Sequence, residues 1–276
     1  MKKSQTTAII TCKGRLEHLK KTVKHFENQG FEKIIVVDYD CPDGTYMYLQ
    51  KYHPTITPII VQNKPIFNLS DARNIGAKMA KSSNILFIDA DIIMNKGALQ
   101  EMEDKLCKNS YVRIKSTKKK KRKHNQTEGT VLIKRKDFYL VGEYDTIFDA
   151  WGGEDTDLYN RLNEISRQQK FVDTQFFSSI EHNDNLRTKF HNFKNLNKQF
   201  TNATRMLTTA LAKFRRANFE LTKNQKVQLR DQLRRVKFFL TPKNIILKNE
   251  SSCYRLEICR RYYLFGPVNF EVKKIA

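Results

Sequence analysis

Up to residue 91, the chain alternates between short apolar runs and stretches with a helical pattern, and this alternation restricts the fold more than any other feature. Apolar runs of strand length occupy residues 6–12, 33–38, 58–62 and 84–88. Helical patterns lie between them at residues 15–29, from the turn at residues 40–44 to about residue 52, and from Ser70, the expected N-cap, to about Lys81. Strands that alternate with helices predict βαβ units. We therefore expect an α/β fold with a mixed, mostly parallel sheet flanked by helices.

The remainder of the chain divides into two parts. Residues 115–128 are basic and low in complexity, and we expect a mobile loop there. A strand over 129–135 and helices over 136–141 and 153–166 complete the predicted domain, residues 1–185. The following residues, up to 238, have two helical apolar stripes (Leu207, Leu211, Phe214 and Leu229, Leu233, Val236), and residues 252–272 are typical of two strands. We therefore predict a C-terminal extension, residues 186–276, that is helical first and then forms short strands.

The charge of the chain is large and uneven. Lys and Arg number 51 against 29 Asp and Glu, a net charge of +22. Residues 111–136 carry +10 and residues 186–276 carry +16, whereas residues 137–185 carry −8. The positive charge implies an anionic partner, such as a sugar nucleotide, a nucleic acid, an anionic membrane surface or an acidic polysaccharide. The acidic segment indicates either metal or acid–base chemistry or a solvated helix face.

Cysteine spacing and apolar runs bear on the compartment. The five cysteines are too widely spaced for a zinc site or a disulfide framework, which favours reduced thiols. The polar N-terminus lacks a signal-peptide pattern, and no apolar run has the length of a membrane span. We predict a cytoplasmic protein that could lie peripherally on the inner face of the membrane through its basic segments. The sequence leaves homo-oligomer formation open.

Carboxylates follow two of the predicted strands. Asp38 ends the strand over 33–38, and Asp89 and Asp91 follow the strand over 84–88. Ligands of open parallel sheets bind at the carboxyl ends of the strands, so Asp38 and Asp89 are candidates by position alone. Carboxylates at i and i+2 suit Mn²⁺ or Mg²⁺ that bridges a diphosphate, although an isolated Asp-x-Asp is more often solvated surface.

A second cluster lies in the acidic segment, at residues 151–157 (WGGEDTD). Its two glycines permit close approach of a ligand to the backbone, and its acids lie at a predicted helix start, where the helix dipole favours them. Trp151 offers a flat face to a sugar ring. The simpler alternative is a helix N-terminus with ordinary capping acids. His182 follows the acidic segment and could donate an imidazole to Mn²⁺, although a lone histidine is usually structural.

Four segments together carry a resemblance to a known family. They are TAIITCKGRLEHL (7–19), VVDYDCPDGT (36–45), NLSDARNIGAKMAKSSNILFIDADI (68–92) and VGEYDTIFDAWGGEDTDLYNRL (141–162). Residues 6–185 resemble GT-A glycosyltransferases of the large inverting family 2 type. The later part of this region is similar to the C-terminal region of beta-1,4-galactosyltransferases and bacterial chondroitin-type polymerases. Residues 186–276 are not covered by the resemblance.

The resemblance implies a role for each matching position. The predicted nucleotide-sugar contacts are Thr11, Arg15, Asp38, Asp71, Arg73, Asp89, Trp151 and Gly153. Asp91 and His182 would bind the metal, and Trp151, Glu154 and Asp155 would contact the acceptor. Asp155 falls on the catalytic base of the inverting enzymes. The chain departs from the family pattern at Asp38-Tyr39, where Asp-Asp is common, and at Gly142-Glu143, where Gly-Gly is usual.

These roles imply a metal-dependent transfer of a hexose or N-acetylhexosamine from a UDP-sugar, with inversion. The acceptor would be a hydroxyl of a glycan or a lipid-linked molecule, in bacterial-type surface polysaccharide synthesis. Two alternatives remain, a nucleic-acid or polyanion-binding protein that uses the basic segments and a non-catalytic module of the same fold. The basic extension could pack on the sheet domain, pair between subunits or lie on anionic lipid.

Overall fold

The structure is a computed structural model that describes residues 4–115, 127, 129–181, 186, 188–191, 198–235, 245–258 and 268–273. The strands are β1 (Thr6–Cys12), β2 (Lys33–Tyr39), β3 (Ile56–Val61), β4 (Asn84–Asp89), β5 (Ile92–Met94), β6 (Ser110–Ile114), β7 (Val131–Lys134), β8 (Gln168–Val172), β9 (Phe177–Ser179), β10 (Ile245–Asn249), β11 (Cys253–Ile258) and β12 (Val268–Lys273). The helices are α1 (Leu16–Glu27), α2 (Thr45–Tyr52), α3 (Leu69–Lys78), α4 (Ala98–Lys105), α5 (Arg135–Leu140), α6 (Glu154–Glu164), the 3₁₀ turn η1 (Thr174–Phe176), α8 (Lys198–Arg216) and α9 (Lys223–Arg235).

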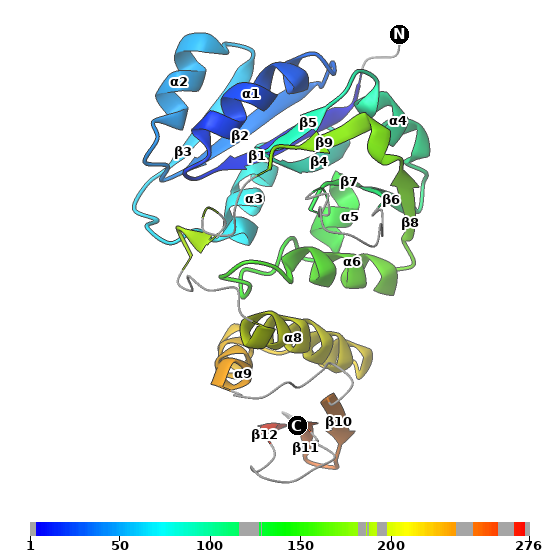
Figure 1. Cartoon of the computed structure of the whole chain (residues 1–276). Coiled ribbons are helices and arrows are strands. Elements are labelled where there is room, and N and C mark those ends of the chain that lie inside the picture. The colour runs from blue at the N-terminus through cyan, green and yellow to red at the C-terminus, as the bar shows by residue number, and fades with distance from the viewer. Residues whose placement is uncertain are drawn as a thin grey trace.

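A seven-stranded sheet forms the centre of the larger part of the molecule, in the order β3-β2-β1-β4-β7-β6-β8 (Figure 1). Strands β1 to β4 are parallel, as βαβ connections require. Strand β7 runs antiparallel to β4 and β6, and β8 is parallel to β6. The prediction of an α/β fold with a mixed, mostly parallel sheet is therefore confirmed.

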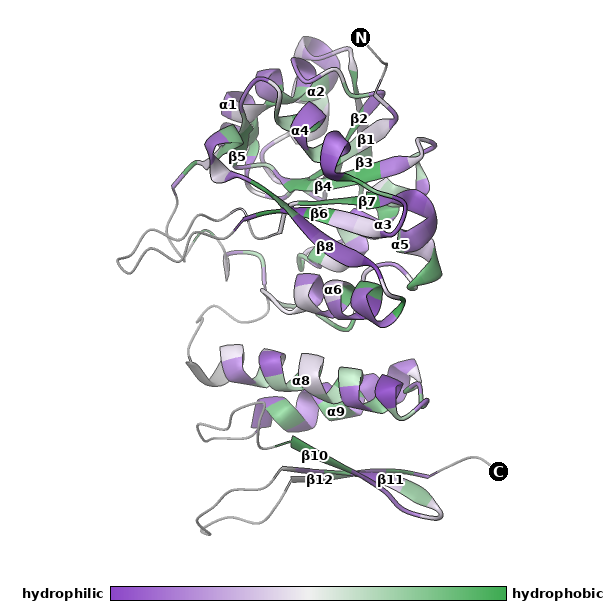
Figure 2. Cartoon of the chain, turned by 90° about the vertical axis from the view of Figure 1, so that its right-hand side faces the viewer, coloured by the Kyte–Doolittle hydropathy of each residue, from purple (hydrophilic) through white to green (hydrophobic). Residues whose placement is uncertain are grey.

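Helices cover both faces of this sheet because alternate residues of its buried strands are apolar on each side. Ala8 and Ile10 of β1 pack with residues of α1, α2 and α4 on one face. Ile9, between them, packs with residues of α3, α5 and α6 on the other face. In Figure 2, β4 and β7 are mainly hydrophobic, whereas the helices around the sheet carry both hydrophilic and hydrophobic residues.

Helix α3 lies very close to the sheet because it has a glycine where it crosses β1. A Cβ atom on Gly76 would be 2.5 Å from Cγ2 of Ile9. The N-cap of the helix lies two residues before the predicted one. Asn68 is the N-cap, and its side chain accepts a hydrogen bond from the backbone N–H of Asp71. The prediction of Ser70 as the cap was wrong, because Ser70 already lies inside the helix and is buried.

The region after residue 186 contains two helices and a three-stranded antiparallel sheet, β10-β11-β12. Apolar residues of α8, α9 and this sheet share one core, which also takes in Ile147 and Phe148 from the loop before α6. The predicted stripes are part of this core as far as the structure describes them, since Val236 lies outside the described residues. The extension thus packs against the α/β part, and strand β10 is an addition to the predicted elements.

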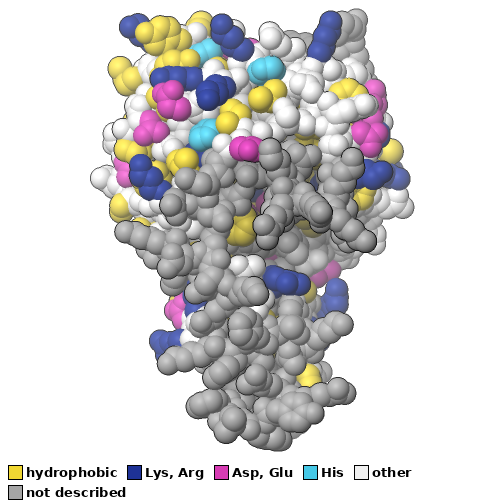
Figure 3. Space-filling model, in the orientation of Figure 1, with side chains coloured by type: hydrophobic (Ala, Val, Ile, Leu, Met, Phe, Trp, Pro, Cys, Tyr) yellow, Lys and Arg dark blue, Asp and Glu magenta, His cyan; other side chains and the backbone are white. Residues whose placement is uncertain are grey.

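The basic segments and the membrane were also subjects of the sequence predictions. Most of the basic loop predicted at residues 115–128 lies outside the described residues. Over the sheet part of the face shown in Figure 3, Lys and Arg side chains are interspersed with Asp and Glu. Within the described ranges, none of the helices has the length and apolarity needed to cross a membrane.

Candidate active site

The carboxyl ends of β1, β2 and β4 lie side by side and bring the predicted residues together. In the parallel register, Thr11 is the partner of Asp89, and Cys12 is the partner of Asp38. Thr11, Asp38 and Asp91 are all buried. The edge of the sheet at which open α/β folds bind their ligands therefore carries the polar residues that the sequence nominated.

Arg73 links the two carboxylates that matter most for the predicted chemistry. Its Nη2 donates to Oδ1 of Asp89 at 2.9 Å, and its Nη1 donates to Oδ1 of Asp155 at 2.7 Å. The guanidinium is buried and stacks over the ring of Tyr144, with 5.0 Å between Cζ and the ring centroid. The hydroxyl of Tyr144 is 3.4 Å from Oδ1 of Asp155. Helix α3 thus holds Asp89 of β4 and Asp155 of α6 in one charged group.

Gly129, which the sequence did not nominate, forms one wall of this group. A Cβ atom there would lie 3.0 Å from Nη2 of Arg73 and 3.2 Å from an oxygen of both Asp155 and Asp89. Any larger residue would crowd all three side chains. Tyr144, which directly follows Gly142-Glu143, was also missed, because the sequence gives no sign that its side chain meets Arg73 and Asp155.

Asp38 has a structural as well as a predicted ligand-binding role. Its carboxylate accepts hydrogen bonds from the backbone N–H of Cys41, at 2.8 Å, and of Tyr46, at 2.7 Å. Burial raises the pKa of Asp38, and the two N–H donors oppose that rise. The carboxylate therefore fixes the turn that joins β2 to α2, at the edge where the nucleotide is expected.

Tyr39, which replaces the family's second aspartate, points to the opposite face of the sheet from Asp38. It is buried, and its hydroxyl donates to Oδ2 of Asp71 at 2.6 Å. Nζ of Lys64 lies 3.1 Å from the same oxygen. Asp71 is therefore engaged by two protein groups, and its predicted contact with the nucleotide-sugar stays a prediction.

The predicted metal ligands are described only in part. Asp91 follows β4 and is buried, with Nη1 of Arg15 4.0 Å from its Oδ2. His182 lies outside the described residues. Within the parts that are described, no group of three or more His, Cys, Asp or Glu residues has a metal-binding arrangement. Asp91 nevertheless fits Mn²⁺ or Mg²⁺, because these cations take one or two protein carboxylates and complete their shell with phosphate oxygens and water.

The segment at residues 151–157 places its acids at the start of α6. Gly152 and Gly153 have φ values of +87° and +97°, a backbone conformation that suits glycine. Trp151 is 42% exposed, whereas Glu154 is only 4% exposed. Burial, with a smaller effect of the neighbouring Asp155, raises the pKa of Glu154 to about 8. Its Oε2 has no hydrogen-bond partner among the described residues.

Two further features lie beside the site. Lys13 is buried and donates from Nζ to the carbonyl oxygens of Asp40 and Lys64, both at 2.8 Å, so it joins the loops after β1, β2 and β3. The position of Lys13, a charged residue directly after a buried strand, was a signal in the sequence that could have identified it.

A cavity of about 310 Å³ lies between Tyr144 and α8. Its lining includes Arg215 but neither Asp89 nor Asp155.

The family of the chain follows from a sequence comparison. The model of glycosyl transferase family 2 matches residues 7–231, so the chain belongs to this family. The match includes α8 and most of α9. None of the curated protein sequences matches the chain significantly. The finer likeness of residues 141–162 to the galactosyltransferase and chondroitin-polymerase region stays a prediction.

Solved structures with the same fold are glycosyltransferases of the GT-A type. The mannosyltransferase PcManGT from Pyrobaculum calidifontis, in complex with GDP-Man and Mn²⁺, has a TM-score of 0.57 and 12% identity over 84% of this chain and 70% of its own. S. aureus TarS 1-349 with UDP-GlcNAc has a TM-score of 0.58 and 12% identity over 87% and 74%. GalNAc-T7 with UDP, GalNAc and Mn²⁺ has a TM-score of 0.51 and 14% identity over 64% and 43%. At such low identity the similarity establishes the fold alone.

Proposed function

We propose that the protein is an inverting, metal-dependent glycosyltransferase that moves a hexose or N-acetylhexosamine from a UDP-sugar to a hydroxyl of a glycan or lipid-linked acceptor. One observation carries the proposal. Arg73 holds Asp155, at the start of α6, and Asp89, at the end of β4, on the same guanidinium. This geometry supports a base for the acceptor and a donor-binding carboxylate within one site.

Asp155 is the proposed base. One of its oxygens accepts from Arg73, so its second oxygen, Oδ2, can take the proton from the attacking acceptor hydroxyl. A direct attack opposite the departing nucleotide inverts the anomeric centre. Arg73 and Tyr144 both contact Oδ1 of Asp155, and this supports a fixed orientation of the carboxylate during attack.

The donor would bind along the strand ends, near Thr11, Arg15, Asp38 and Asp89. UDP is supported by two of the similar structures, which hold UDP-GlcNAc and UDP, and Mn²⁺ is present in two of them. Asp91, with His182, would hold the cation, which when bound neutralises the charge of the departing diphosphate. Arg15, close to Asp91, is placed to contribute positive charge to the same diphosphate.

The acceptor would lie between Trp151 and Glu154. The exposed indole suits the apolar face of a sugar. The buried Oε2 of Glu154 has no hydrogen-bond partner among the described residues, and a hydroxyl of the acceptor could supply one. We extend the proposal to surface polysaccharide synthesis, with the basic segments facing an anionic membrane or an acidic glycan.

The competing proposal, a nucleic-acid-binding protein, has less support, because Lys226, Arg230 and Arg234 pair with carboxylates of the same chain.

The proposal is tested by UDP release from a panel of UDP-sugars with Mn²⁺, with EDTA as the control. NMR of the product then gives the anomeric configuration. We expect metal-dependent turnover of one donor with inversion. Retention of configuration would contradict Asp155 as a base for direct attack, and the absence of any effect of UDP plus Mn²⁺ on the melting temperature would contradict the donor site.

A further inference from the structure

The loop and helix that carry the proposed base are contacted by the C-terminal extension at regular intervals. Four residues spaced four apart, Asp145, Asp149, Gly153 and Asp157, each meet a side chain of α8 or α9. These contacts surround Trp151 and Asp155, which lie between them in the sequence. The −8 segment thus meets the +16 extension at the site itself.

Asp149 accepts hydrogen bonds from two arginines of α9. Nη1 of Arg230 donates to its Oδ2 at 2.9 Å, and Nη2 of Arg234 donates to its Oδ1 at 2.6 Å. The side chains of all three residues are less than a quarter exposed, so solvent screens these ion pairs less than it screens surface pairs. Two arginines, one turn apart on α9, therefore hold both oxygens of a carboxylate two residues before Trp151.

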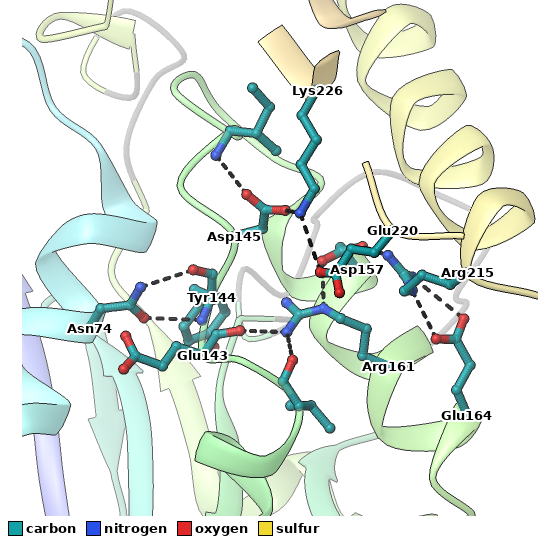
Figure 4. A network of polar contacts seen from close by, with 12 residues as sticks. Asn74, Glu143, Tyr144, Asp145, Asp157, Arg161, Glu164, Arg215, Glu220 and Lys226 are labelled. Carbon is teal, nitrogen blue, oxygen red and sulfur yellow. Dashed lines mark hydrogen bonds and ion pairs between the residues drawn. The ribbon is translucent and has the colours of Figure 1, made fainter. Parts of the chain in front are cut away.

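The contacts on either side of Asp149 are also partly buried (Figure 4). Nζ of Lys226 donates to Oδ2 of Asp145 at 2.8 Å. Nη1 of Arg215 donates to Oδ1 of the fully buried Asp157 at 3.1 Å. The same arginine bonds to Glu164 near the end of α6. Helix α6, with Asp155 in its first turn, is therefore held along its length by the extension.

Close packing of Gly153 also restricts the same loop, independently of charge. A Cβ atom on Gly153 would lie 2.5 Å from Cγ2 of Thr204 on α8 and 2.8 Å from Cε1 of Phe148. The Gly153 backbone is thus enclosed between α8 and its own loop, directly before Glu154 and Asp155. The position of α8 consequently limits where the start of α6 can lie.

We propose that Arg230 and Arg234 of α9 are positioning residues for the transfer reaction, which act through Asp149 to fix the loop that carries Trp151 and leads into Asp155. This inference rests on the proposed function. It assigns the extension a part in assembling the acceptor side of the site. A misplacement of about 1 Å at reacting groups can lower a rate by about 10²-fold, so a loosened loop should lower kcat.

Trp151 allows a test that does not depend on activity, because it is the single tryptophan of the chain and lies two residues from Asp149. The test compares the wild type with Arg230→Gln/Arg234→Gln in the full chain, by fluorescence anisotropy and acrylamide quenching. The control is Lys248→Gln/Arg255→Gln, which removes an exposed and a half-buried cation that pair with carboxylates of the β10–β12 sheet. We expect lower anisotropy and stronger quenching only in the first variant.

Kinetics and binding complete the test. We expect kcat to fall about tenfold or more in Arg230→Gln/Arg234→Gln, with the affinity for UDP plus Mn²⁺ within about twofold of the wild type. Arg230→Lys/Arg234→Lys should recover part of kcat. A lower melting temperature with unchanged kcat and fluorescence would show a merely structural role and overturn the inference. If the wild type transfers no sugar, the proposed function fails, while the Trp151 signal still decides whether α9 positions the loop.

Discussion

Arg73 and Asp155 are 82 residues apart in the sequence, and their side chains are 2.7 Å apart in the structure. The arginine is fully buried on α3, and the aspartate lies in the first turn of α6. Because the same guanidinium also holds Asp89, one side chain links the carboxylate proposed to bind the donor to the proposed base.

Replacement of Arg73 by methionine should therefore destabilise the protein. It leaves Asp89 and Asp155 without their shared cation, and we expect a loss of about 2–3 kcal/mol, because both carboxylates remain partly exposed. Urea unfolding measures the change. Arg167→Met is the matched control, since Arg167 bonds to a single carboxylate, that of Asp137, outside the site. An equal loss in both variants would argue against a special role for Arg73.

Asp155→Asn should abolish transfer and leave donor binding intact. The amide cannot accept the proton of the acceptor hydroxyl, so we expect kcat to fall by about 10²- to 10⁴-fold. UDP plus Mn²⁺ should still raise the melting temperature of the variant as it does that of the wild type. Near-normal turnover by Asp155→Asn would remove this residue from the mechanism.

Glu154 should make stability depend on pH. Its pKa is raised from 4.5 to about 8 in the folded protein, mainly by burial. Between these values the folded state binds a proton that the unfolded state has released, so this residue makes the protein less stable as pH rises from about 4.5 to about 8. Glu154→Gln removes the effect. Its melting temperature should rise relative to the wild type between pH 6 and pH 8.5, whereas that of the exposed Glu32→Gln should follow the wild type throughout.

Gly76→Ala tests the close packing of α3 on β1. The new methyl group would be 2.5 Å from Ile9, and the helix would have to move away from the sheet. We expect a destabilisation of about 1–3 kcal/mol, although alanine favours helix more than glycine does. Because Arg73 is one turn earlier on the same helix, kcat should fall as well. Lys78→Ala, an exposed position of α3, should change stability by less than about 0.5 kcal/mol.

The sequence predicts those parts of the protein that depend on local pattern. Residues 33–38 and 84–88 are apolar runs that each follow a helical stretch, so their strands, and the carboxylates at their ends, could be placed on one edge of a parallel sheet. The short strands β5 and β9 have only three residues each, too few to show a pattern in the sequence, and they pair with each other.

The contacts within the site were less predictable than its members. Asp89 and Asp155 could be nominated, but the bond of each to Arg73 depends on how α3 and α6 cross the sheet. Gly129 was missed because its importance comes from the three side chains that surround it and not from its own turn. The ion pairs of α9 were likewise hidden, since charge counts show the two opposite segments but not which residues meet.

The pairing of Asp149 with Arg230 and Arg234 has a consequence for the order of events during synthesis. The arginines follow the aspartate by 81 and 85 residues. At about 5–20 residues per second, a ribosome reaches them roughly 4 to 17 seconds after Asp149. During that interval the sheet can form from β1 to β8, while the loop before α6 has no countercharge from α9. The loop that carries Trp151, on the proposed acceptor side of the site, thus gains these two ion pairs only after α9 has been synthesised.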